Sequence, residues 1–156
     1  MSPADDIEFL ACPPGEPPAR TLIEAMVAEL KELYGITSGR LGVPLDPAEL
    51  GPPGGVYLVG WAGGETVAGG GVRTIGPALG EIKRMYVAPS WRGRGVARRL
   101  LGALEEAARS LGHERVRLDT GPRQPEARRL YETAGYVSIP DYNDNHHAAF
   151  WGEKAL

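Results

Sequence analysis

Two arginines and two glycines alternate at residues 92–95, directly before a long helical pattern. The first turn of a helix leaves backbone N–H groups without partners, and together with the helix dipole these groups attract anions. Glycine lets the backbone approach a ligand closely, and arginine adds charge-assisted hydrogen bonds. The segment predicts an anion cradle that suits a pyrophosphate better than a single carboxylate. The alternative is a tight glycine turn with solvated arginines.

The common nucleotide-binding patterns do not describe this segment. Arg98 stands where the third glycine of G-x-G-x-x-G would fall, and the sequence contains no G-x-x-x-x-G-K-[ST]. A dinucleotide fingerprint and a nucleoside-triphosphate loop are therefore both disfavoured.

A strand and a long helix must position the cradle. Residues 81–87 read as a strand stopped by Pro89, residues 95–111 as an amphipathic helix stopped by Gly112, and residues 116–119 as the next strand. A helix that links two neighbouring strands implies a right-handed crossover and a parallel pair. On the outer side of this helix, we expect Glu105 and Arg109 to form an i,i+4 ion pair.

The remaining pattern predicts antiparallel strands and two further helices. Three consecutive glycines at 69–71 inside one strand indicate a bulge or a close approach by another group. We predict an α/β, or mixed α+β, fold: one domain over residues 1–156 with helices packed on a mixed sheet. The expected strands are 7–12, 56–61, 66–75, 136–139 and 148–154, and the expected helices are 21–34 and 125–134, with one helical turn at 47–50.

Two segments resemble motifs of the GCN5-related N-acetyltransferase (GNAT) superfamily. Residues 81–97, with Arg92, Gly95 and Ala97 at defined positions, resemble its motif A, and residues 127–136, containing Leu130-Tyr131, resemble its motif B. The resemblance is strong from 81 to 136 and weak before 55. It implies a mostly antiparallel sheet with one splayed parallel strand pair, and an acyl-coenzyme A, usually acetyl-CoA, as the acyl donor.

The resemblance also implies which residues hold the cofactor. Backbone groups of Met85, Tyr86 and Val87 would bind the pantetheine arm beside a strand bulge around Tyr86. Backbone amides and side chains of the loop would hold the pyrophosphate. The expected loop residues are Arg92, Gly93, Arg94, Gly95, Val96 and Ala97.

Acyl transfer to an amine needs a neutral amine, a polarised thioester carbonyl and a protonated leaving thiolate. Glu81 is a candidate general base, directly or through water; the alternative is a strand-end carboxylate that pairs with Lys83. Tyr131 is a candidate acid for the thiolate; the alternative is a core aromatic. Strand alternation places Lys83 and Arg84 on opposite faces, where one could meet an acidic substrate, although solvation is the simpler account.

The sequence predicts less about the acceptor side of the site. In the resembled family, Tyr34 and the segment 142–147 would flank the acceptor, so Tyr142 and Asn143 are candidate substrate contacts; an exposed hairpin loop is the alternative. Adjacent His146 and His147 point apart in an extended chain, so we expect no metal site.

Composition limits the partners. The net charge of −3 disfavours a nucleic-acid binder, and no apolar stretch is long enough to span a membrane. One cysteine allows no internal disulfide, and residues 1–6 lack a secretory leader pattern, so we expect a cytoplasmic protein. The leading hypothesis is acetyl transfer from acetyl-CoA to a small primary amine. A protein lysine or N-terminal acetyltransferase, a non-catalytic acyl-CoA sensor and a homodimer remain open.

Overall fold

A computed structural model describes residues 6–39 and 41–156. Most of the segment inspected for a leader, residues 1–5, lies outside the described part. One sheet holds seven strands in the order β1-β2-β3-β4-β5-β7-β6. The strands are β1 (Glu8–Ala11), β2 (Val56–Ala62), β3 (Glu65–Gly76), β4 (Leu79–Val87), β5 (Arg115–Thr120), β6 (Val137–Ser138) and β7 (Phe150–Ala155). The helices are α1 (Ala19–Leu33), η2 (Pro47–Leu50), η3 (Pro89–Trp91), α2 (Val96–Ser110) and α3 (Pro125–Thr133).

The mixed sheet predicted from the sequence is confirmed. Strands β4 and β5 are parallel, and every other neighbouring pair is antiparallel. Pairing of β4 with β5 begins at Leu79↔Arg115 and stops at Glu81↔Arg117, although β4 continues to Val87. The two strands therefore separate over the second half of β4, as the expected splay requires.

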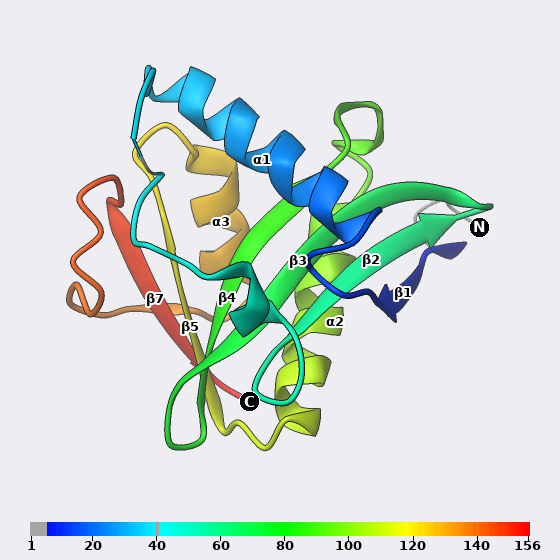
Figure 1. The fold of residues 1–156 in the computed structure, drawn as a ribbon. Coiled ribbons are helices and arrows are strands. Elements are labelled where there is room, and N and C mark those ends of the chain that lie inside the picture. The colour runs from blue at the N-terminus through cyan, green and yellow to red at the C-terminus, as the bar shows by residue number, and fades with distance from the viewer. Residues whose placement is uncertain (1–5, 40) are drawn as a thin grey trace.

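Helices cover both faces of the sheet. Helix α1 crosses one face, and α2 runs along the opposite face (Figure 1). Leu22 of α1 joins a small core with Tyr57 and Val59 of β2. Leu100 and Leu104 of α2 join a larger core to which Tyr131 of α3 also belongs. None of the described helices combines the length and the apolar character needed to cross a membrane.

One side-chain prediction for α2 is wrong. Glu105 does not pair with Arg109 on the outer side: its side chain is buried, accepts a hydrogen bond from Tyr136 Oη at 2.8 Å and pairs with Lys154 Nζ at 3.1 Å. Arg109 pairs instead with Glu106. The helix is rotated so that Glu105 faces the last strand, where the partly buried Lys154 supplies a counter-charge.

The glycine run of β3 lies opposite a bulge in β4, as the sequence predicts. Gly69 pairs with Tyr86 and Gly71 with Lys83, so Gly70 faces both Arg84 and Met85. A Cβ at Gly70 would come within 2.9 Å of Leu104 Cδ1, and one at Gly71 within 2.8 Å of Leu50 Cδ2. The glycines therefore admit side chains from both faces of the sheet.

The bulge lies at Arg84–Met85, just before the expected Tyr86. Arg84 has a φ of 60°, in the left-handed region that residues other than glycine seldom adopt. This conformation breaks the strand alternation. Lys83 and Arg84 consequently line the same cavity, and the prediction that they point to opposite faces is wrong.

Candidate active site

A cavity of about 660 Å³ extends from the splayed end of β4 to the start of α2. Trp91 and Arg98 contribute to its wall, together with Leu130 and Tyr131 of α3. Among the residues expected to hold a cofactor, Arg94 alone is absent from the lining. The others that line this cavity are Met85, Tyr86, Val87, Arg92, Gly93, Gly95, Val96 and Ala97.

The backbone before α2 has the conformation that the anion-cradle hypothesis requires. Gly93 and Gly95 have φ values of 77° and 80°. Gly95 is the N-cap of α2 and has no side chain to accept a hydrogen bond from the first turn. The N–H groups at the start of α2 therefore remain available to a ligand in this cavity.

Arg92 connects the loop to two neighbouring elements. Its Nε donates to the Val87 carbonyl oxygen at 2.9 Å, and its Nη2 lies 2.9 Å from both carboxylate oxygens of Glu29 in α1. Its guanidinium also stacks over the Tyr86 ring at 5.4 Å. Arg92 thus fixes the loop against β4 and α1, whereas Arg94 turns aside and stacks over Trp91 at 5.1 Å.

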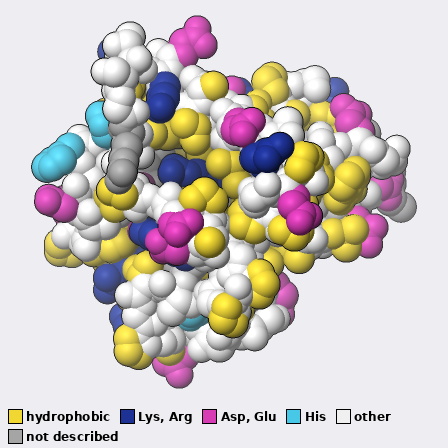
Figure 2. Space-filling view, in the orientation of Figure 1, with side chains coloured by type: hydrophobic (Ala, Val, Ile, Leu, Met, Phe, Trp, Pro, Cys, Tyr) yellow, Lys and Arg dark blue, Asp and Glu magenta, His cyan; other side chains and the backbone are white. Residues whose placement is uncertain are grey.

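A second cavity, of about 110 Å³, adjoins the first. Its wall is polar and comes from α1, the bulge of β4, the end of β5 and the segments at 41–43 and 145–147. Figure 2 shows basic side chains recessed among apolar ones on this face of the molecule. The two cavities share five lining residues, namely Met26, Leu30, Met85, Gln124 and Tyr131.

Tyr131 stands at the junction of the two cavities. It is 8% exposed, and its hydroxyl points to Met85 Sδ at 3.7 Å. Burial, and then the charge of Asp119, raises the pKa of Tyr131 far above its usual value, so the phenol stays protonated at neutral pH. A protonated phenol can donate a hydrogen bond or a proton to a group placed at this junction.

Glu81 is completely buried and lines none of the cavities described. Arg73 Nε donates to Glu81 Oε1 at 2.8 Å, and Arg73 Nη1 also reaches Glu49 at 2.8 Å. The Tyr142 hydroxyl donates to Glu81 Oε2. Burial first, and then the charge of Glu81, raises the pKa of Tyr142. In this structure Glu81 therefore lies behind these neighbours and is not part of either cavity wall.

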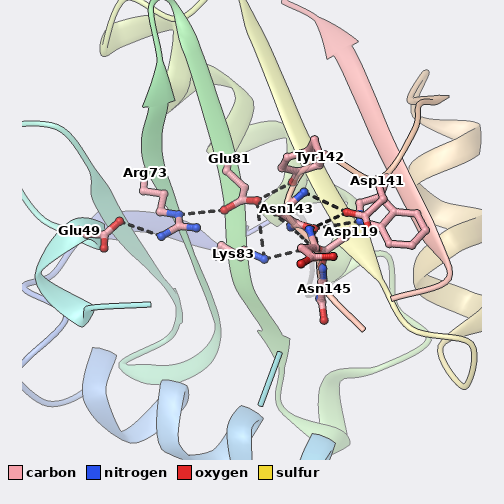
Figure 3. A network of polar contacts seen from close by, with 11 residues as sticks. Glu49, Arg73, Glu81, Lys83, Asp119, Asp141, Tyr142, Asn143 and Asn145 are labelled. Atoms are coloured by element: carbon pink, nitrogen blue, oxygen red, sulfur yellow. Dashed lines mark hydrogen bonds and ion pairs between the residues drawn. The ribbon is translucent and has the colours of Figure 1, made fainter. Parts of the chain in front are cut away.

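Asp119, at the end of β5, is the carboxylate that lines the small cavity. Lys83 Nζ lies 3.3 Å from Asp119 and 3.8 Å from Glu81, and the Asn143 side-chain amide donates to both carboxylates. Figure 3 shows this network, which continues through Arg73 to Glu49. Glu81 is thus linked to the cavity wall through Lys83 and Asn143.

The candidate substrate residues are placed differently from one another. Tyr34 lines the small cavity, donates to Gln124 Oε1 at 3.2 Å and accepts from the Arg123 backbone N–H at 3.1 Å. Tyr142 and Asn143 lie behind the wall of the small cavity. Tyr142 donates a hydrogen bond to Glu81, and Asn143 donates to both Glu81 and Asp119. From the same segment, Asn145 and His147 line the cavity instead.

Comparison with known proteins decides the family. The model of the acetyltransferase (GNAT) family matches residues 19–136. The chain belongs to this family. The acetyltransferase is 33% identical over 129 residues to the uncharacterized N-acetyltransferase YjgM of Escherichia coli, with 77% of each chain covered. It is 38% identical over 118 residues to the IAA acetyltransferase of Azospirillum brasilense, with 74% of each chain covered.

Solved structures have the same fold. A proposed acyl-CoA N-acyltransferase from Klebsiella pneumoniae is 27% identical and has a TM-score of 0.75, with 96% of the acetyltransferase and 97% of the other chain covered. A GNAT family acetyltransferase from Elizabethkingia anophelis, with acetyl-CoA bound, has a TM-score of 0.71 at 16% identity, with 97% and 99% covered.

Sequence reasoning missed several residues that line the cavities of this acetyltransferase. Asp119 and Thr120 end β5, and Gln124 lies just before α3. Asp119 and Thr120 could have been predicted from the sequence, because ligands in α/β folds bind at the carboxyl ends of strands. Glu29 carried no signal, because its contact with Arg92 joins segments 63 residues apart.

Proposed function

We propose that the protein transfers the acetyl group of acetyl-CoA to the primary amine of a small molecule by direct attack. The observation that carries this proposal is the junction of the two cavities at Met85 and Tyr131. A thioester placed there would face an amine in the small cavity while the rest of the cofactor occupies the larger one. The relatives described above support an acyl-CoA donor.

The larger cavity suits the cofactor in the chemistry of its lining. The pyrophosphate would bind the free N–H groups before and at the start of α2, where Gly93 and Gly95 keep the backbone accessible. The pantetheine arm would lie along Met85, Tyr86 and Val87, where β4 has already separated from β5. Its amides would then find backbone partners that the sheet leaves unused.

The size of the small cavity favours a small acceptor. About 110 Å³ accommodates a short amine, and a neighbouring cavity of about 600 Å³ shares Leu41, Val43 and Arg84 with it. Two relatives carry names with small acceptors: the IAA acetyltransferase, and the aminoalkylphosphonate N-acetyltransferase of Salmonella typhimurium, 38% identical over 58 residues and 37% of this chain.

The reaction moves one proton from the amine and one proton to sulfur. The amine lone pair attacks the thioester carbon, the C–S bond breaks, and the Tyr131 phenol donates to the departing thiolate. We propose that Asp119, which lines the small cavity, is the carboxylate that faces the amine. We propose Glu81 as an indirect base, because Lys83 and Asn143 lie between its carboxylate and the cavity. The N–H groups of the β4 bulge would polarise the carbonyl.

A thiol-release assay tests the proposal. Purified protein, acetyl-CoA and a panel of small primary amines should release coenzyme A only when an amine is present, and mass spectrometry should find the N-acetylated amine. Tight coenzyme A binding with no turnover on any amine would favour an acyl-CoA sensor. Turnover on peptides alone would favour a protein acetyltransferase.

A further inference from the structure

Arg84 is the residue of the bulge whose position the proposed reaction does not yet explain. Its backbone adopts a φ of 60°, and Arg84 lines the small cavity together with Lys83 and Asp119, and also a neighbouring cavity of about 600 Å³ together with Lys31 and Glu49. Strained conformations outside glycine persist where the surrounding structure enforces them, and they gather at functional sites. Without the bulge, normal strand alternation would turn Arg84 away from this cavity.

Among the described residues, no partner is found for the guanidinium donors of Arg84, in contrast to those of its basic neighbours. Arg73 lies between Glu49 and Glu81, and Lys83 lies between Glu81 and Asp119. Within residues 6–39 and 41–156, no hydrogen bond or ion pair joins any side chain to the guanidinium of Arg84. Burial, and then the charge of Arg73, lowers the pKa of Arg84, as expected for a partly desolvated cation without a close partner.

A second polar group in the same wall has no partner in the described part of the chain. The Thr120 hydroxyl is buried and makes no hydrogen bond to any described residue, although Thr120 lines the small cavity. Buried hydroxyls are nearly always hydrogen-bonded in folded proteins. Arg84 and Thr120 therefore offer unmet donors on the wall that also carries the Asp119 carboxylate.

The charges in and directly behind this wall match a zwitterion better than a simple amine. Lys83, Arg84 and Asp119 line the cavity, and Arg73, Glu81 and Glu49 continue the network behind it, so three cations are balanced by three carboxylates. A ligand with one ammonium and one acidic group keeps this balance, with the ammonium near Asp119 before it loses its proton. The planar guanidinium of arginine binds carboxylate and phosphate oxygens through two parallel N–H bonds.

We propose that the acceptor amine carries an oxyacid group, a carboxylate or a phosphonate, a few bonds from its nitrogen, and that Arg84 binds this group. The proposal rests on the proposed acetyl transfer and adds the substrate class. Arg84 is then a specificity-determining residue, because it selects amines by the charge on their far end.

The test compares amines that differ only in this charge. The panel pairs glycine, 3-aminopropanoate and 4-aminobutanoate with their carboxamides, and adds 2-aminoethylphosphonate as the phosphonate. We expect the wild-type kcat/KM to favour at least one acid over its neutral counterpart. Arg84→Gln should reduce that preference about 10- to 100-fold, as loss of a charged hydrogen-bonded pair predicts. Arg84→Lys should restore part of it.

Arg115→Gln is the matched control, because Arg115 is exposed, lies on β5 and forms its ion pair with Glu153, away from the cavities. Its preference should equal the wild-type value, and all variants should bind coenzyme A alike in calorimetry.

Wild-type protein that acetylates the carboxamides as well as the acids, or Arg84→Gln protein that keeps the preference, would overturn the inference. Failure to acetylate any amine would instead overturn the proposed function. Better turnover of the phosphonate, lost in Arg84→Gln, would identify phosphonate as the acidic group.

Discussion

At the scale of single residues, Tyr131 and Tyr136 offer a direct comparison. Both are buried tyrosines whose rings meet at 5.9 Å, but only Tyr131 lines the junction of the cavities. We expect Tyr131→Phe to lower kcat about 100-fold, because general acid catalysis contributes on this order, and to leave coenzyme A affinity nearly unchanged. Steady-state kinetics and calorimetry provide the two measurements.

Tyr136→Phe serves as the control for this prediction. It removes the hydrogen bond to the buried Glu105, so it should lower the free energy of unfolding by about 1–3 kcal/mol and leave kcat close to wild type. A kcat of Tyr131→Phe equal to the wild-type value would remove Tyr131 from the acid role.

The roles proposed for Glu81 and Asp119 predict different changes in the pH profile of kcat/KM. A base must be unprotonated to act, so the acid limb of kcat/KM reports its ionisation. Glu81→Gln removes a carboxylate that contacts Lys83 and Asn143, the two residues that also contact Asp119. If Glu81 acts as an indirect base, kcat/KM of this variant should fall and its pH profile should differ from that of the wild type.

Asp119→Asn should lower kcat and abolish that limb. If the profile of Glu81→Gln matches wild type while Asp119→Asn loses the limb, Glu81 has only a positioning role. Unchanged profiles in both variants would mean that water or another group takes the proton.

The sequence indicated Tyr131 and the loop at 92–97 because those residues lie in contiguous motifs. It could not indicate that Glu81 is buried, because that depends on Arg73 and Tyr142, which strand pairing and a distant loop bring to it. It assigned Arg84 to the wrong face for a similar reason. Strand alternation holds only where no bulge intervenes.

At the scale of elements, the start of α2 is the part of the donor site that a backbone change can test. Gly95 has a φ of 80°, and a side chain in this region costs about 1–2 kcal/mol. We expect Gly95→Ala to raise the Kd for coenzyme A about tenfold or more, because the strained loop would no longer hold its N–H groups in place. Calorimetric titration measures this change.

Gly102→Ala, in the exposed middle of the same helix, is the control. A Cβ at Gly102 meets nothing within 4 Å, so alanine should bind coenzyme A normally and stabilise the protein by about 0.5–1 kcal/mol. Native affinity in Gly95→Ala would place the phosphate site elsewhere.

Element types and order were predictable because apolar periodicity and Gly or Pro boundaries agree along most of the chain. The helix predicted at 95–111 is observed at Val96–Ser110, and the strand predicted at 81–87 begins earlier, at Leu79. Side-chain partners across elements were less predictable. Glu105 looks like a surface residue in the helical pattern, and only its contact with Lys154 explains its burial.

At the scale of the whole molecule, charged side chains of alternating sign form a row across the sheet. Register places Arg73 beside Glu81, Glu81 beside Arg117, and Arg117 beside Glu153, so signs alternate over four strands. Arg117 also stacks over Tyr142 at 5.1 Å. This row connects the candidate site to the packing of the sheet, so we expect substitutions in it to change stability and activity together.

The pH dependence of folding should report on His113, which is 7% exposed and lies just beyond α2. Burial lowers the pKa of His113 below its usual 6.5 in the folded protein. The unfolded chain therefore binds the proton more readily, so this stabilisation is complete above pH 6.5 and is lost as pH falls through the folded pKa. We expect the urea midpoint to drop between pH 7.5 and 5.5.

The drop should be smaller in His113→Gln, whose amide can still donate to Thr74 Oγ1 in place of Nε2. The exposed residue His146 provides a control, since His146→Gln should behave like wild type. An equal drop in wild type and His113→Gln would assign the pH dependence to other groups.

The most direct test of the account is a crystal structure with coenzyme A. We expect the pyrophosphate at the N–H groups around Gly93 and Gly95, the pantetheine arm along Met85 to Val87, and the sulfur within hydrogen-bonding distance of Tyr131 Oη, facing the small cavity. Coenzyme A bound with its pyrophosphate away from the start of α2, or with its sulfur away from Tyr131, would contradict it.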